Sequence, residues 1–271
     1  MNASVAFDRA VENLEATYRA VGLRGDGAVE EQYETGFACV SALPHAISNY
    51  AILSASDEAL ARHLGGIARK RKAFNVYLKP GIGLESSVRA LERAGFREAG
   101  RLALLFREGA PSGRRTVQDS QHALFHVERP GELSIVELTS FEDRLQVSRF
   151  MAAQFFGRQT SALRESIAVS TARAPVDLYR VSGPRPFAAA MTVRTGGQLG
   201  IYNLCVESSM RERGYGSQLL DRLIQYAHEE GRNLNLQCDP SLEPWYEKRG
   251  FGSQGTILVF GLDRKPHHAI M

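Results

Sequence analysis

The sequence is poor in several features that would point to particular protein classes. It holds three cysteines in 271 residues, Cys39, Cys205 and Cys238, and no two of them form a Cys-x-x-Cys pair. Cys205 and Cys238 lie in apolar, strand-like runs, so we expect buried, reduced thiols rather than a disulfide framework. The histidines show no metal-ligand spacing either, and the sequence therefore predicts no metal site.

The net charge is also small, and long hydrophobic runs are absent. A formal net charge of +3, without a basic stripe interleaved with aromatic residues, argues against bulk nucleic-acid binding. No apolar run approaches the roughly 20 residues of a membrane span. The opening stretch MNASVAFDRAVENLEA carries acidic residues where a signal peptide needs an apolar core. These observations predict a cytoplasmic protein that binds neither nucleic acid nor membrane.

What the chain does have is the composition of a soluble globular protein, with 44% hydrophobic and 23% charged residues. Its length allows two domains of ordinary size. The segment APSGRRTVQDS, residues 110–120, is rich in Pro, Gly, Ser and charge and is typical of a linker. We therefore predict a first domain over residues 1–115, a linker over 116–130 and a second domain over 131–271.

The second domain shows alternating strand and helix patterns. Strands are expected at Leu133–Leu138, Asp177–Val181, Phe187–Arg194, Leu199–Val206, Asn233–Cys238 and Thr256–Leu262. Helices are expected from a cap at Thr139–Glu142 through Phe155, and over Ser161–Thr171, Gly214–Glu229 and Leu242–Arg249. Glycine-bearing turns predict hairpins among the earlier strands, and a strand-helix-strand crossover follows near the end. The fold class is α/β.

The first domain repeats that ending. Strands are expected at Ala46–Ser54, Phe74–Leu78 and Arg101–Phe106, with a helix capped near Ser54 or Ser56 and a second helix over Leu84–Ala94. LERAGFREAG at 91–100 matches YEKRGFGSQG at 246–255, each with a helix stop, Gly-Phe and a third glycine at the same interval. The matching order of elements predicts an internal duplication at the scale of a domain.

One loop carries the clearest chemical signal. In MRERGYGSQLL, residues 210–220, two glycines stand between arginines and a helix follows. The N–H groups of a first helical turn lack internal partners, and glycines let an anion approach them closely, so a diphosphate could bind here. A flexible turn before a helix fits this segment equally well. The loop has neither the dinucleotide fingerprint nor a Gly-Lys-Ser/Thr triphosphate loop.

A second motif at the right distance changes that balance. Val206, Ser208, Arg211, Gly214 and Gly216 match Val-x-Pro-x-x-Arg-x-x-Gly-x-Gly with Ser208 in place of Pro, and Tyr-Glu-Lys-x-Gly-Phe follows at 246–251. Together these motifs resemble the GCN5-related N-acetyltransferase (GNAT) family over residues 133–262. The resemblance implies two GNAT-like domains in tandem, each a mixed, mostly antiparallel sheet flanked by helices. The first would be a degenerate copy.

The resemblance also implies an activity and a site. Members of the family bind acetyl-CoA as co-substrate and transfer the acetyl group directly to an amine of a small molecule or peptide. The pyrophosphate would lie on the loop and helix start, and the pantetheine arm along the preceding strand. Tyr246 occupies the position whose phenol protonates the departing thiolate. The implied cofactor-binding residues are Leu204, Cys205, Val206, Arg211, Glu212, Arg213, Gly214, Tyr215, Gly216 and Ser217.

Several departures from the family pattern leave alternatives open. Asp239 stands where many relatives have an Asn that contacts the cofactor, and the strand before the loop carries no carboxylate. The amine proton could leave through water, to Glu207, to the Tyr202 hydroxyl or to a residue of the first half. In the first half Leu91 falls where Tyr246 lies and the glycine loop is missing, which predicts one active site per chain. A non-catalytic acyl-CoA-binding or regulatory protein is the alternative.

Overall fold

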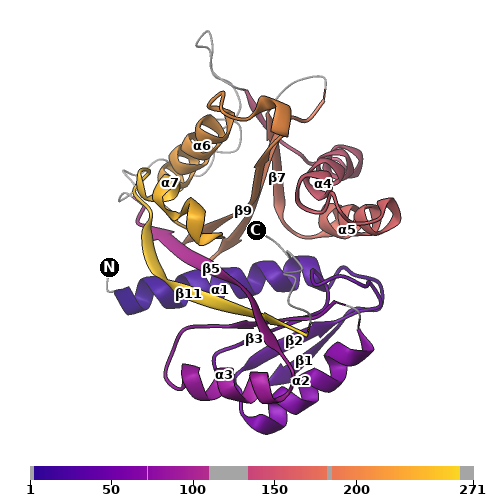
Figure 1. Cartoon of the computed structure of the whole chain (residues 1–271). Helices are drawn as coiled ribbons and strands as arrows, with labels where there is room; N and C mark the ends of the chain where they lie inside the picture. The colour runs from indigo at the N-terminus through magenta and orange to yellow at the C-terminus, as the bar shows by residue number, and fades with distance from the viewer. Residues whose placement is uncertain (1–2, 72, 110–133, 182–184, 263–271) are drawn as a thin grey trace.

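The computed structural model describes residues 3–71, 73–109, 134–181 and 185–262 as one eleven-stranded sheet with helices on both faces (Figure 1). The first half contains α1 (Ala3–Gly22), β1 (Val29–Tyr33), β2 (Gly36–Val40), β3 (Tyr50–Leu53), α2 (Glu58–Lys70), β4 (Asn75–Leu78), α3 (Leu84–Arg93) and β5 (Arg97–Arg107). The second half contains β6 (Ile135–Glu137), α4 (Phe141–Phe155), α5 (Ser161–Arg173), β7 (Asp177–Val181), β8 (Ala188–Thr195), β9 (Gln198–Val206), the 3₁₀ turn η2 (Ser208–Met210), α6 (Tyr215–Glu229), β10 (Asn233–Cys238), η3 (Pro240–Leu242), α7 (Glu243–Glu247) and β11 (Gly252–Gly261). The predicted linker over 116–130 lies outside the described residues.

The order of the strands shows the internal repeat. The sheet runs β1-β2-β3-β4-β11-β5-β10-β9-β8-β7-β6. In each half two antiparallel pairings, β1-β2-β3 and β7-β8-β9, lead to a parallel pair joined by a crossover helix, β3-α2-β4 and β9-α6-β10. The α/β class, the mixed sheets and the matching order of elements are thus as the sequence predicts.

The two halves exchange their closing strands. β5, the last strand of the first half, pairs with β10 of the second half, and β11 pairs with β4 of the first. β5 and β11 also pair with each other, antiparallel, from Gly252 opposite Phe106 to Gly261 opposite Arg97. The two half-sheets therefore form one continuous sheet, and the halves cannot separate without breaking its central ladders.

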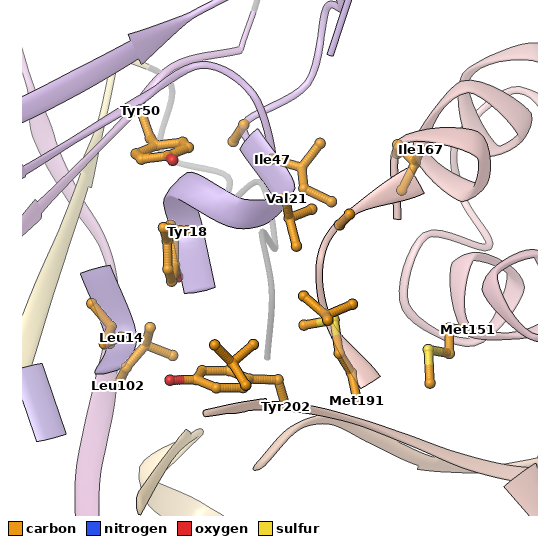
Figure 2. Close-up of a cluster of buried hydrophobic side chains, with 14 of the residues drawn as sticks. Leu14, Tyr18, Val21, Ile47, Tyr50, Leu102, Met151, Ile167, Met191 and Tyr202 are labelled. Carbon is orange, nitrogen blue, oxygen red and sulfur yellow. The ribbon is translucent and has the colours of Figure 1, made fainter. Parts of the chain in front are cut away.

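Helix α1 joins the two halves on one face of this sheet. Figure 1 shows it crossing between them. Its buried side chains Leu14, Tyr18 and Val21 share a core cluster with residues of α4 and α5. α6 and α7 cover a separate cluster in the second half. α2 and α3 cover a third cluster, in the first half. In Figure 2 the side chains of α1 lie between Tyr50 of the first half and Tyr202 of the second. No helix within the described ranges is long and apolar enough to cross a bilayer.

Helix α2 begins with a different cap from the predicted one. Its N-cap is Asp57, whose carboxylate accepts the Leu60 N–H at 2.8 Å. The cap is expected near Ser54 or Ser56, and the observed cap is one residue after Ser56, whose own N–H donates to the Ser87 hydroxyl at 3.0 Å. A carboxylate therefore occupies the N-terminus of α2.

Candidate functional site

Strands β9 and β10 are paired over only part of their length. The parallel ladder between them ends at Ile201 opposite Leu236, although β9 continues to Val206. Beyond that rung β9 keeps its pairing with β8 alone. In the described part of the chain, the edge of β9 that faces β10 therefore offers backbone groups without a strand partner, and such an edge can pair with an extended ligand.

A bulge in β9 begins directly after the last rung of this ladder. Across the register shift between Ala189 and Met191 of β8, β9 carries one residue more than its neighbour. Asn203, in the bulged stretch, has φ 50, a left-handed conformation that few residues other than glycine adopt. A bulge bends its strand and increases the local twist. The predicted pantetheine-binding residues 204–206 begin within the bulge, at Leu204, and continue beyond it.

The N-terminus of α6 lies just beyond the end of β9. Its N-cap is Gly214, with φ 80 and no side-chain cap bond. Glu212 is also left-handed, with φ 63, so the loop turns sharply before the helix. The first-turn N–H groups of Tyr215, Gly216 and Ser217 have no capping side chain, and the helix dipole adds partial positive charge there. This arrangement suits an anion.

Gly216 is a glycine that the protein's own structure does not require. It lies in the first turn of α6 and has no left-handed φ. A Cβ built on it would meet the Val206 Cγ2 at 3.5 Å, which is an ordinary van der Waals contact. Glycine costs a helix roughly 0.5–1 kcal/mol relative to alanine. The missing side chain leaves the backbone of this turn open to close approach.

The side chains of the loop also make contacts that hold it in place. Arg211 and Arg213 are both exposed. The Arg211 Nε donates to the carbonyl of Val206 at 3.2 Å, which ties the loop to the end of β9. The ring of Tyr215 packs edge-on against Phe187, with centroids 5.0 Å apart, and this contact holds the first residue of α6 against the residue that precedes β8.

Tyr246 lies in α7 and is almost buried, with 8% of its surface exposed. Its ring packs edge-on against Trp245 and Phe251. Burial is the main cause that raises the pKa of Tyr246 above its usual value, and Arg249 partly opposes it. The phenol therefore stays protonated at neutral pH, as a proton donor must.

Arg249 connects the two motifs and was not among the predicted site residues. Its guanidinium donates to the Ser217 Oγ at 2.5 Å and to the Trp245 carbonyl at 3.1 Å, and lies 4.3 Å from the centroid of the Trp245 ring. It also forms an ion pair with Asp221 at 3.4 Å. α7 is thereby held against the start of α6. Arg249 occupies the variable position of Tyr-Glu-Lys-x-Gly-Phe, so the sequence motif gives no signal for it. Its contacts are seen only in the folded structure.

The candidate general bases differ in burial and in hydrogen bonding. Tyr202 is buried, and its hydroxyl donates to the Asn13 Oδ1 at 2.7 Å. Burial raises the pKa of Tyr202, so its deprotonated form is not available near neutral pH. Glu207 is partly exposed and lies 3.8 Å from Arg185. The Asp239 carboxylate accepts from the N–H and hydroxyl of Ser241.

The cysteines and the metal prediction can be compared with the structure as well. Cys39, Cys205 and Cys238 are free and buried, as the sequence predicts, and burial raises the pKa of each to about 12. No cluster of three His, Cys, Asp or Glu side chains is placed to hold a metal ion among the described residues.

The first half lacks each part of this arrangement. Its parallel pair β3-β4 is closed along the whole of β3, from Tyr50 opposite Asn75 to Leu53 opposite Leu78. The carboxylate of Asp57 caps α2, the counterpart of α6. Leu91, in the place of Tyr246, is buried in the core between α2, α3 and the sheet. Among the described residues, the β3-β4 pair therefore has no open edge of the β9 kind, and α2 has no uncapped start like that of α6.

Taken together, the bulged strand, its open edge and the glycine-opened helix define a fold of the GCN5-related N-acetyltransferase class. Residues 154–260 match the family model of the acetyltransferase (GNAT) domain, so the second half of this chain contains a GNAT domain.

Similar proteins agree with this family. A "probable glucosamine 6-phosphate N-acetyltransferase 2" from Oryza sativa subsp. japonica is 34% identical over 75 residues, which are 27% of this chain and 45% of the rice protein. A GCN5-related N-acetyltransferase from Kribbella flavida has a TM-score of 0.58 at 16% identity, covering 95% of both chains. A tandem GNAT protein from the clavulanic acid biosynthesis pathway has a TM-score of 0.51 at 13% identity, covering 95% of this chain and 97% of that one. The fold of the whole chain is therefore that of a tandem GNAT protein.

Proposed function

We propose that this protein is an acetyl-CoA-dependent N-acetyltransferase with one active site per chain, in its second half. The observation that carries the proposal is the open edge of β9 leading into the uncapped, glycine-opened start of α6. Acetyl-CoA presents two amides in an extended arm and then a diphosphate, so it needs a strand edge followed by an anion site. The chain supplies both in that order.

The binding roles follow from this geometry. The backbone of Leu204, Cys205 and Val206 would pair with the amides of the pantetheine arm. The N–H groups from about Arg213 to Ser217 would hold the diphosphate, while Arg211 and Arg213 add favourable charge. Gly216 leaves the space that the phosphate oxygens need. An N–H near Val206 would stabilise the oxyanion that develops on the thioester carbonyl.

The chemistry is a direct transfer. The nitrogen of a neutral amine attacks the thioester carbonyl carbon, the C–N bond forms and the C–S bond breaks. The leaving thiolate takes the proton of the Tyr246 phenol, and the proton of the attacking nitrogen goes to water or to a nearby base such as Glu207. Solvent then restores the phenol proton. Because the rice relative is named for an amino-sugar phosphate, glucosamine 6-phosphate is the first acceptor to test.

We further propose that residues 1–115 form a non-catalytic GNAT-like copy, that 116–130 link it to a catalytic domain over 131–271, and that the protein acts in the cytoplasm. Three buried free thiols suit such a reducing setting. The alternative function is acyl-CoA binding without turnover, which shares the cofactor site.

A thiol-release assay separates the two functions. Acetyl-CoA is mixed with the protein and, in turn, glucosamine 6-phosphate, glucosamine, amino acids and short peptides, and free CoA is measured. Acceptor-dependent release that falls in Tyr246→Phe supports the enzyme. Binding of acetyl-CoA without release for any amine class supports the binding-only alternative. Absence of any thermal stabilisation by acetyl-CoA contradicts both.

A further inference from the structure

Asn13 of α1 is a first-half residue that reaches three strands of the second half. Its side chain is fully buried, with 0% exposed. The Nδ2 donates to the carbonyl of Val193 at 2.9 Å and to the Thr195 Oγ1 at 2.8 Å, both at the end of β8. The Oδ1 accepts from the Tyr202 hydroxyl of β9 at 2.7 Å and from the Asn235 Nδ2 of β10 at 3.2 Å. One amide thus bridges β8, β9 and β10.

This amide lies where β9 and β10 separate. Asn235 is paired with Gly200, one rung before the last rung of the ladder, Ile201 opposite Leu236. Tyr202 is the first residue of β9 beyond that rung. Figure 2 shows the Tyr202 ring extending from β9 toward Leu14, the neighbour of Asn13 in α1. The Asn13 oxygen therefore binds one group on each strand at the fork between them.

The backbone of β9 is adapted to this contact. A Cβ on Gly200 would come within 1.8 Å of the Asn13 Oδ1, so no other residue fits there without displacing the Asn13 side chain. An amide side chain has two donor hydrogens and an acceptor oxygen with two lone pairs, and Asn13 uses all four. A fully satisfied buried amide has one favourable position, because any shift leaves a buried polar group unpaired. Asn13 therefore fixes β9 relative to β10.

We propose that Asn13 is a positioning residue for the coenzyme A slot: through it, the first half holds β9 and β10 at the separation that the pantetheine arm requires. The inference rests on the proposed function, since the slot is the one assigned to acetyl-CoA. It explains why a half that has closed its own fork remains joined to the active one. Without the Asn13 oxygen the Tyr202 hydroxyl and the Asn235 amide lose their shared acceptor, and the fork samples other separations. Affinity falls in proportion to the population that remains competent.

The test measures the dissociation constant of CoA by calorimetry, together with the melting temperature, for five proteins. Tyr202→Phe removes one hydroxyl and keeps the ring. Asn13→Leu replaces the amide by an apolar side chain of similar size. Leu14→Val is the matched control, because Leu14 is the next residue of α1, is buried in the same core and has no polar bond to the fork. The wild type and the Asn13→Leu/Tyr202→Phe double variant complete the set.

The expected result is about fivefold weaker CoA binding for Tyr202→Phe, the factor that one net hydrogen bond of about 1 kcal/mol represents. Asn13→Leu should weaken it further, and the double variant should be no worse than Asn13→Leu alone. Leu14→Val should lower the melting temperature and leave the dissociation constant within about twofold, since its cost is a cavity term.

Wild-type affinity in folded Tyr202→Phe overturns the inference and leaves the proposed function standing, and this holds even where Asn13→Leu does not fold. An equal loss of affinity in Leu14→Val also overturns it, because general destabilisation would then be the cause. Failure of the wild type to bind CoA would instead overturn the proposed function itself.

Discussion

Replacing Gly216 with alanine should make the free protein more stable and its binding of coenzyme A weaker. The residue lies in the first turn of α6 with no left-handed φ, and the added methyl group would meet Val206 at an ordinary 3.5 Å. Alanine is favoured over glycine in such a position by roughly 0.5–1 kcal/mol. In a chain of this size that corresponds to a rise in melting temperature of about 1–4 °C.

The effect on binding has the opposite sign. The new methyl group would lie in the first turn of α6, close to the N–H groups where the phosphate oxygens are expected. A hydrogen bond to a charged group contributes about 1.5–3 kcal/mol, so the loss of one weakens binding about 10- to 150-fold. Thermal unfolding without ligand and calorimetry with CoA measure the two quantities on the same sample.

Two further glycines serve as controls. Gly66 lies in α2, where nothing comes within 4 Å of an added Cβ, so Gly66→Ala should give a similar stabilisation with unchanged CoA affinity. Gly214 has φ 80, so Gly214→Ala should lose about 1–2 kcal/mol of stability as well as affinity. Wild-type affinity in Gly216→Ala would refute the placement of the diphosphate.

Other consequences can be checked in parallel. Tyr246→Phe keeps the packing with Trp245 but removes the phenol proton, so kcat should fall about 100-fold or more with CoA affinity unchanged. Because burial raises the pKa of Tyr246, loss of the phenol proton should not limit the activity of the wild type as pH rises from 7 to 9. In the folded protein the pKa of each of Cys39, Cys205 and Cys238 is about 12, so only about one thiol in ten thousand is ionised at pH 8. The three thiols should therefore resist iodoacetamide at pH 8 and react only after unfolding, as measured by mass spectrometry. Asp57→Ala should cost about 0.5–2 kcal/mol in chemical denaturation and create no second CoA site, since β3 and β4 remain paired. Residues 131–271 expressed alone lack β5 beside β10, so circular dichroism and gel filtration should show a poorly folded or aggregated fragment; a cooperative, monomeric fragment would argue against the importance of the exchanged strands.

The elements of the second half could be predicted because their signals are local. β7 and β10 have the predicted bounds, Asp177–Val181 and Asn233–Cys238, since short apolar runs between turn residues mark strands well. α4 begins where Ser140 accepts the N–H of Asp143 at 3.1 Å, within the cap expected at 139–142. The glycine loop was recognisable for the same reason.

The parts that sequence reasoning did not find depend on distant residues. α1 and the hairpin β1-β2 carry no motif, and no prediction covered them. The exchange of β5 and β11 was also beyond reach, because both strands follow the same helix-Gly-Phe signal and nothing local states which neighbour each will pair with. Asn13 reads as an ordinary polar residue in a helix until α1 is placed against β9 and β10, about 190 and 220 residues away along the chain.

For the site, the two motifs are local in the sequence, whereas their arrangement in space is not. The bulge at Asn203 and the end of the β9-β10 ladder at Ile201 have no residue signature, yet they explain why residues 204–206 can receive a ligand. Arg249 was missed because its partners, Ser217 and Asp221, lie on another helix. The catalytic role of Tyr246 and the cofactor contacts of residues 211–217 remain predictions.

The central claim is that one half of the chain has an open coenzyme A site and the other has closed its counterpart. Calorimetric titration of the purified full-length protein with CoA tests it most directly, because the stoichiometry counts the sites. One CoA bound per chain, with affinity lost in Gly216→Ala and kept in Gly66→Ala, is the predicted result. Two CoA molecules per chain, or none, would contradict the account.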